Sequence, residues 1–259
     1  MAPVPDPSPV VARLRAAGCV YAEEEAALLV ASAAGPEELE RLVLARIGGA
    51  PLEVLLGWAE VDGLRVQVAE GVFVPRQRSL LLARLAIAAL GEGGVAVDLC
   101  CGTGVLGALV ARAVPAAEVW AGDIDPAAVA CARRNLVPER VVLGDLYDAL
   151  PDALRGRVDV LVVNAPYVPT EAIALMPPEA RLHEARVALD GGADGLDVQR
   201  RVIEQAGRWL SPSGLLLVES SVEQAPRTRA LMIGAGLDAW AHHDDDLDAT
   251  AVAGRPPTA

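Results

Sequence analysis

Short apolar runs that alternate with segments of helical spacing from residue 95 onward constrain this fold more than any other feature. The runs are apolar almost throughout, so both faces of each strand must be covered, as in a parallel sheet with helices on either side. Strands are predicted at residues 95–99, 118–122, 140–143, 158–163 and 215–219, helices at 105–114, 126–136 and 196–210, and a final hairpin at 237–241 and 250–253. The sequence therefore predicts an α/β fold with a mostly parallel, doubly wound sheet.

A unit of short helices precedes this series. Helical spacing is found over residues 10–17, 23–33 and 36–46, and alternating prolines precede it. Asp62-Gly63 stands between two alternating runs, which is a strong signal for a β-hairpin. The predicted organisation is a disordered, proline-rich start over 1–9, a helical domain over 10–56, a hairpin linker over 57–74 and the main domain over 75–259, which opens with a helix at 77–90.

The charge balance narrows the classes of function. The 22 cationic side chains are all arginine, against 35 acidic ones, and the net charge is −13. The absence of lysine excludes a Schiff-base lysine and a Walker-A lysine. Because proteins that hold nucleic acid need clustered cations, the acidic balance makes nucleic acid an unfavoured partner.

The sequence does not predict a membrane partner, a disulfide-bonded secreted protein or a metal site. No stretch approaches the ~18 continuous apolar residues that span a bilayer, and the start lacks the pattern of a secretory signal, so no membrane partner is predicted. The four cysteines show no C-x-x-C spacing, which favours a reducing cytoplasm. Residues 242–246, His-His-Asp-Asp-Asp, are too close in sequence to converge on one ion, so a solvated loop and no metal are predicted.

A glycine loop follows the first strand of the series. Gly102, Gly104 and Gly107 match G-x-G-x-x-G and open a helix, and Asp123 ends the next strand. A nicotinamide-dinucleotide site would show the same features, so the motif alone is ambiguous. Close approach of a ligand to the backbone explains Gly102 and Gly104 in either case.

The acidic residues favour a different ligand. Asp98 lies where a dinucleotide would place its pyrophosphate, and its carboxylate suits instead the ammonium group of S-adenosylmethionine (SAM), which has no phosphate. Asp123 would accept from the ribose hydroxyls, and Asp145 from the adenine amine. The alternative, that these are ordinary polar residues at strand ends, is less favoured because three acids recur at successive strand ends.

The fourth strand ends in Asn164-Ala165-Pro166-Tyr167, and here the chain resembles the HemK/PrmC-type protein-glutamine methyltransferases, class I SAM-dependent enzymes. The resemblance covers residues 51–255 and includes the hairpin, 74–76, 98–104, 123–126 with Asn135, 191–196, Glu219 with Gln224, and 253–255. It implies a Rossmann-like, seven-stranded sheet with a small N-terminal helical domain. The cofactor site that it implies comprises Asp98, Cys100, Gly102, Gly104, Asp123, Ile124, Asp145, Leu146 and Asn164.

The resemblance also implies the chemistry. An amide nitrogen is a poor nucleophile, so an enzyme that methylates it must orient it toward the SAM methyl. The Asn164 side-chain oxygen and the Ala165 carbonyl would each accept one amide N–H, with Pro166 completing the loop and Tyr167 covering the flat face of the amide. Arg76, Asn164 and Tyr167 would bind the substrate, a protein with an exposed glutamine such as a translation release factor.

The chain departs from the family pattern in three places. Ala165 replaces the first proline of Asn-Pro-Pro-Tyr, Cys100 replaces a glycine of Asp-Leu-Gly-Cys-Gly, and Pro-Arg-Pro-Glu-Thr-Glu reads Pro-Arg-Gln-Arg-Ser-Leu over residues 75–80. This last change, together with an N-terminal helical unit shorter than the family's usual substrate-docking domain, suggests a substrate other than the standard release factor. Three alternatives stay open: methylation of an exocyclic adenine amine in nucleic acid, a non-catalytic SAM-fold binding module, and a dinucleotide oxidoreductase.

Overall fold

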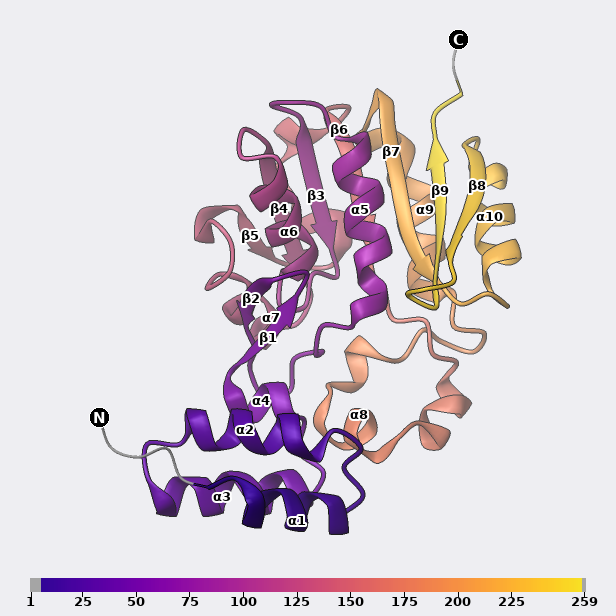
Figure 1. Cartoon of the computed structure of the whole chain (residues 1–259). Coiled ribbons are helices and arrows are strands. Elements are labelled where there is room, and N and C mark those ends of the chain that lie inside the picture. The colour runs from indigo at the N-terminus through magenta and orange to yellow at the C-terminus, as the bar shows by residue number, and fades with distance from the viewer. Residues whose placement is uncertain (1–5, 258–259) are drawn as a thin grey trace.

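A seven-stranded sheet forms the main body of the computed structural model, which describes residues 6–257. Its strands are β3 (Val95–Leu99), β4 (Glu118–Asp123), β5 (Val141–Leu143), β6 (Val158–Val163), β7 (Leu210–Ser220), β8 (Asp238–Asp244) and β9 (Ala249–Arg255). They lie in the order β5-β4-β3-β6-β7-β9-β8, parallel from β5 to β7, with β9 antiparallel to both neighbours. The predicted mostly parallel, doubly wound sheet is confirmed (Figure 1).

Helices cover both faces of this sheet, because the side chains of each strand alternate between the faces. On one face, Ala96 and Val160 pack in a core with α5 (Leu80–Ala89) and α6 (Val105–Ala113). On the other face, Val97 and Leu161 pack in a core with α9 (Asp197–Trp209) and α10 (Ala225–Gly234). Figure 1 shows α5 in front of the sheet and α9 behind it.

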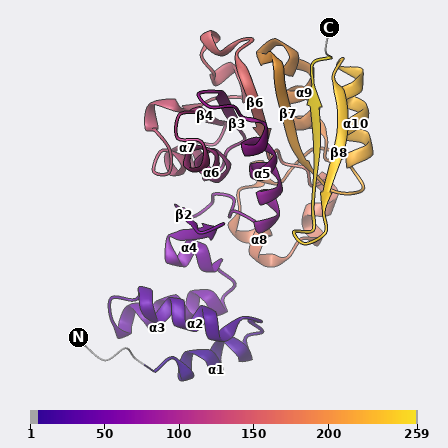
Figure 2. The same ribbon diagram turned by 45° about the horizontal axis from the view of Figure 1, so that its top comes forward.

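The N-terminal helices form a core of their own around Leu14, Leu29 and Val43. They are α1 (Ser8–Ala16), α2 (Ala22–Ser32), α3 (Pro36–Ile47) and α4 (Leu52–Leu56). The hairpin β1 (Trp58–Val61) and β2 (Leu64–Gln67) follows, and positive φ angles at Asp62 and Gly63 give its turn the twist expected for Asp-Gly. In Figures 1 and 2 this unit lies on the side of the sheet where the parallel strands end.

Several predicted boundaries need correction. Ser8 and Pro9 already belong to α1, so the disordered start is wrong for these two residues, while residues 1–5 lie outside the described residues. Residues 77–79 form a 3₁₀ turn before α5, and α7 (Pro126–Ala132) is shorter than predicted. The residues after it form turns, and the Asn135 side chain binds backbone groups of Gln67 and Thr103.

The last part of the chain is also more ordered than predicted. The predicted final hairpin is confirmed, but β8 extends through His242 and His243, which are therefore in a strand and not in a loop. Residues between β6 and β7 contain an unpredicted helix, α8 (Pro178–His183), which is joined to the N-terminal unit by an ion pair of Arg46 with Glu179. Within residues 6–257, no helix combines the length and the apolar character that crossing a membrane requires.

Candidate active site

A cavity of about 770 Å³ opens where the parallel strands end, which is the place where sheets of this kind bind ligands. Most of the predicted site residues border it: Cys100, Gly102, Asp123, Ile124, Asp145, Leu146, Asn164, Ala165, Pro166 and Tyr167. Three predicted residues do not border it, namely Asp98, Gly104 and Arg76. The strand ends therefore bring most of the predicted site together, as expected.

Gly102 and Asp123 form the wall below β3 and β4. A Cβ atom added to Gly102, whose φ is +55°, would meet only the Cβ of Phe73 at 4.0 Å, so the backbone is open to a ligand here. The Asp123 carboxylate accepts hydrogen bonds from the backbone N–H groups of Gly102 and Asp125, both at 2.9 Å. Burial raises the pKa of Asp123, and these two bonds oppose that rise.

Gly104 has a packing role, which corrects the expectation that a ligand approaches it. A Cβ atom there would lie 2.9 Å from Leu136 Cδ1 and 3.1 Å from Ala132 Cβ. Contacts this short are not tolerated without movement of the neighbours. Glycine at this position therefore lets the segment around α7 pack against the start of α6.

Asp98 lies behind the glycine loop and not in the cavity wall, which corrects its predicted contact with SAM. Its side chain is buried, and Oδ2 accepts from the backbone N–H of Gly107 at 3.0 Å. Within the described residues, Oδ1 has no hydrogen-bond partner. Asp98 thus fixes the first turn of α6, which carries the loop.

Cys100 occupies a strained position in the cavity wall. Its φ is +56°, in the left-handed region that favours glycine, and Leu146, which also borders the cavity, has a φ of +51°. Cys100 therefore has a backbone conformation that favours glycine, the residue that the family has at this position. It places a Cβ atom where that conformation disfavours one.

Replacing Cys100 with glycine is expected to raise the free energy of unfolding by about 1 kcal/mol. A left-handed backbone costs roughly 1–2 kcal/mol for a residue with a Cβ atom, and this cost is removed in the glycine variant. The greater freedom of glycine in the unfolded chain offsets part of the gain. Urea denaturation followed by circular dichroism measures the change. The matched control is Cys101→Gly, at a neighbour that is not among the residues of positive φ, where the same change should destabilise. Destabilisation by both variants would contradict the strain at Cys100.

Carboxylates accompany the arginines around the cavity. Asp145 accepts from Arg201 through Oδ2 at 2.6 Å, and its Oδ1 can accept from an adenine amine. Arg76 donates to the buried Glu184 at 2.6 Å, behind the wall, which corrects its predicted place in the substrate site. These ion pairs leave the mouth without a continuous basic surface.

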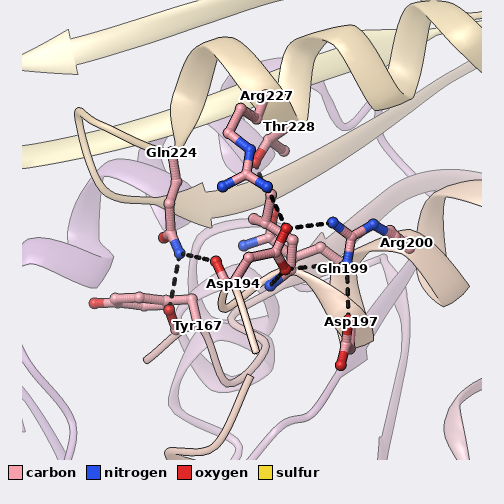
Figure 3. Close-up of polar contacts among 9 residues, drawn as sticks. Tyr167, Asp194, Asp197, Gln199, Arg200, Gln224, Arg227 and Thr228 are labelled. Atoms are coloured by element: carbon pink, nitrogen blue, oxygen red, sulfur yellow. Dashed lines mark hydrogen bonds and ion pairs between the residues drawn. The ribbon is translucent and has the colours of Figure 1, made fainter. Parts of the chain in front are cut away.

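The loop from Asn164 to Tyr167 rests on a second loop that precedes α9. Gln224 donates through Nε2 to the backbone carbonyls of Tyr167 at 3.0 Å and Asp194 at 3.2 Å. Figure 3 shows the Asp194 carboxylate between Arg200 and Arg227, and the hydrogen bond from Arg200 lowers the pKa of Asp194 to about 2. The two loops are therefore clamped to each other and to α9 and α10.

Glycine is required in this second loop because the backbones approach closely. A Cβ atom on Gly195 would lie 2.3 Å from the carbonyl oxygen of Tyr167, and one on Gly191 would lie 2.7 Å from that of Pro166. The motif at residues 191–196 thus acts as a rigid support for the loop that borders the cavity.

The support leaves two hydrogen-bond acceptors unused at the cavity wall. Among the described residues, no donor binds Oδ1 of Asn164 or the main-chain carbonyl of Ala165. The Tyr167 hydroxyl donates to Glu219 at 3.4 Å, and burial raises the pKa of Tyr167 to about 12, so the phenol stays protonated. The wall therefore offers acceptors for a group with two N–H bonds.

Three residues that meet at this loop, Arg78, Ser79 and Glu219, had no predicted site role, although Glu219 and residues 75–80 entered the family resemblance. Ser79 and Arg78 border the cavity, and Glu219 lies buried beside them. A signal existed for Glu219, which is the first charged residue after the apolar run of a parallel strand, in the position where Asp98 and Asp123 were noticed. No comparable signal marks Ser79.

Comparisons with known proteins agree with this geometry. Residues 64–193 match the model of the methyltransferase small domain family. The chain is 40% identical to a release factor glutamine methyltransferase of Gloeobacter violaceus, over 76% of this chain and 71% of the relative. It is 36% identical to another of Mycolicibacterium smegmatis, over 95% and 92%. It is also 37% identical to a 4-amino-L-phenylalanine/4-methylamino-L-phenylalanine methyltransferase of Streptomyces pristinaespiralis, over 80% and 73%.

A solved methyltransferase from Pyrococcus furiosus has the same fold, with a TM-score of 0.55 over 74% of this chain and 89% of that one, at 18% identity. The sheet order and the cavity at its carboxyl edge define a class I, SAM-dependent methyltransferase. More narrowly, the chain belongs to the family of the release factor glutamine methyltransferases.

Proposed function

We propose that this enzyme methylates the side-chain amide nitrogen of a glutamine in a second protein, a translation release factor. The names of its relatives support a release factor in place of the other substrate that residues 75–80 suggested. The observation that carries the proposal is the pair of unused acceptors, Asn164 Oδ1 and the Ala165 carbonyl, beside Tyr167 at the cavity wall. A primary amide has two N–H donors on one nitrogen. Two acceptors on one rigid loop can engage both donors and fix the plane of the amide.

Orientation is the main contribution of these residues. When bound, SAM supplies a methyl group on a positively charged sulfur. Asn164 and Ala165 hold the acceptor nitrogen so that its out-of-plane lone pair faces that methyl group, and the ring of Tyr167 limits how the amide can turn. As positive charge develops on the nitrogen, the two oxygens stabilise it more strongly than they stabilise the neutral amide. Once methylated, the cationic nitrogen would lose one of its N–H protons to water, because a nitrogen-protonated amide is a strong acid, so no general base is required.

The residues of the glycine loop fit SAM, because the Asp123 carboxylate and the open backbone at Gly102 suit a ribose better than a pyrophosphate. Replacing Asp123 with alanine is expected to weaken SAM binding by about 10–100-fold, since hydrogen bonds to a charged group contribute about 1.5–3 kcal/mol. Isothermal titration calorimetry measures the SAM affinity of each protein. Asp123→Asn serves as the control variant, because its side-chain oxygen can still accept from the Gly102 N–H. Unchanged affinity, or binding of NAD in place of SAM, would show that the ribose contact is misplaced.

The charges around the cavity favour protein over nucleic acid as the acceptor. Arg78, Arg186 and Arg201, which border the cavity, each face a carboxylate at 2.6–3.2 Å. A polyanion would have to displace those carboxylates on a chain whose net charge is already −13.

We also place the protein in the cytoplasm, where its four free cysteines would stay reduced.

Transfer of labelled methyl from SAM tests this function. The purified protein is incubated with labelled SAM and with a bacterial release factor produced in an unmethylated form, and mass spectrometry locates the methyl group. We expect label on a glutamine of the release factor. Label found instead in total nucleic acid or on 4-amino-L-phenylalanine, with none in protein, would overturn the proposal.

A further inference from the structure

A buried carboxylate lies directly behind the loop that carries Asn164 and Tyr167. Glu219 is 3% exposed, and its Oε2 accepts from the Ser79 hydroxyl at 2.7 Å. Its Oε1 accepts from Arg78 Nε at 3.2 Å and from the Tyr167 hydroxyl at 3.4 Å. The Asn164 side chain completes the group, because its Nδ2 donates to Ser79 Oγ at 3.2 Å.

The Glu219 carboxylate fixes the direction of the hydrogen bonds that connect it through Ser79 to Asn164. A carboxylate can only accept, so the single proton of the Ser79 hydroxyl must point to Glu219. The hydroxyl then has only lone pairs left for Asn164, which must turn its NH₂ group toward Ser79. An asparagine side chain held by its NH₂ group presents its oxygen on the opposite side.

We infer that Glu219, acting through Ser79, sets the orientation of the Asn164 amide so that its oxygen meets the substrate amide. The inference rests on the proposed function, in which that oxygen accepts an N–H of glutamine. Without Ser79, the Asn164 amide could rotate by half a turn. Its NH₂ group would then face the N–H donors of the substrate amide. Glu219 and Ser79 are thus positioning residues, and Glu219 also holds the Tyr167 hydroxyl directly.

Burial makes this arrangement effective. Ser79 is 4% exposed, so water does not readily replace it as the partner of either neighbour. The backbone of Glu219 is held as well, since its carbonyl accepts from the fully buried Gln199, whose own Oε1 accepts from Thr228. The strand pairing sets the distance, because Val163 and Val218, the residues just before Asn164 and Glu219, are paired in β6 and β7.

The test compares Ser79→Ala with Ser79→Thr, which keeps the hydroxyl, and with Glu219→Gln. The glutamine has nearly the same shape as the glutamate but can offer Ser79 a donor or an acceptor. Four quantities are measured: kcat and KM for transfer to the unmethylated release factor, the SAM dissociation constant, and the ¹H–¹⁵N signals of the Asn164 side-chain amide, which are assigned by their loss in Asn164→Ala.

We expect Ser79→Ala to lower kcat about tenfold, the effect of one hydrogen bond of about 1.4 kcal/mol, without changing SAM affinity. The Asn164 amide signals should shift, and Ser79→Thr should restore both the signals and most of the lost kcat. Glu219→Gln should lower kcat despite its conserved size. Unshifted Asn164 signals in Ser79→Ala, or equal losses of kcat in the alanine and threonine variants, would overturn the inference. If the wild-type protein transfers no methyl group, the proposed function fails, and the Asn164 signals alone decide the inference.

Discussion

Replacing Asn164 with alanine is expected to lower kcat for methyl transfer by about 10²–10³-fold, the effect typical of removing one pre-organised hydrogen-bonding group from a transition state. The reason is that the proposed function gives Asn164 Oδ1 one N–H bond of the substrate amide and the main-chain carbonyl of Ala165 the other. SAM affinity should be retained because the glycine loop and Asp123 stay in place. Single-turnover transfer and calorimetric titration with SAM separate the two effects.

The side chain of Leu175, which is exposed and outside the cavity wall, supplies a control. Leu175→Ala should leave the single-turnover rate at saturating release factor near that of the wild-type protein. If Asn164→Ala transfers methyl groups at the wild-type rate, the amide is oriented by some other group. Loss of SAM binding in the same variant would instead assign Asn164 mainly to the cofactor.

The free energy of unfolding should fall as the pH rises from about 4 to about 8, at up to about 1.4 kcal/mol per pH unit from Asp98 alone. Burial raises the pKa of Asp98 from 3.8 to about 8, so the folded protein keeps this proton over a range in which the unfolded chain has lost it. Because the unfolded state then binds fewer protons than the folded state, each increase in pH favours unfolding. Above about pH 8 both states are ionised and the contribution of Asp98 levels off.

Asp98→Asn isolates this contribution, because an amide oxygen can still accept from Gly107 but cannot ionise. Urea denaturation of both proteins at several pH values should give a shallower fall for the variant, and a stability above that of the wild-type protein near pH 8. Asp123 and Glu184 also have raised pKa values, and they are present in both proteins, so the difference between the curves reports on Asp98. Parallel curves would show that Asp98 ionises normally in the folded protein.

The predictions that succeeded depend on periodicity and on strand ends. Apolar runs long enough to be buried on both faces could only be strands of a covered sheet, so the positions of β3, β4 and β6 followed directly. Parallel strands end at one edge, so Asp123, Asp145 and Asn164 were expected beside one another, and all three border the cavity.

The predictions that failed concern side chains whose role depends on contacts with residues far away in the sequence. Asp98 and Asp123 point to the same face of the sheet, yet only Asp123 borders the cavity. Asp98 is paired with Ala121 inside the sheet and is covered by the first turn of α6, whereas Asp123 lies two residues further along, at the very end of β4. Arg76 was expected to bind substrate, but Glu184, 108 residues later in the chain, binds its guanidinium group.

Local patterns in the sequence were enough to predict the sheet, the glycine loop, the family and the loop from Asn164 to Tyr167. The direction in which the Asn164 amide faces became known only from the folded structure. That orientation depends on Ser79 and Glu219, which are 140 residues apart in the chain and meet because α5 packs across β6 and β7. Hydrogen-bond direction is a property of the assembled group, so no local pattern in the sequence could reveal it.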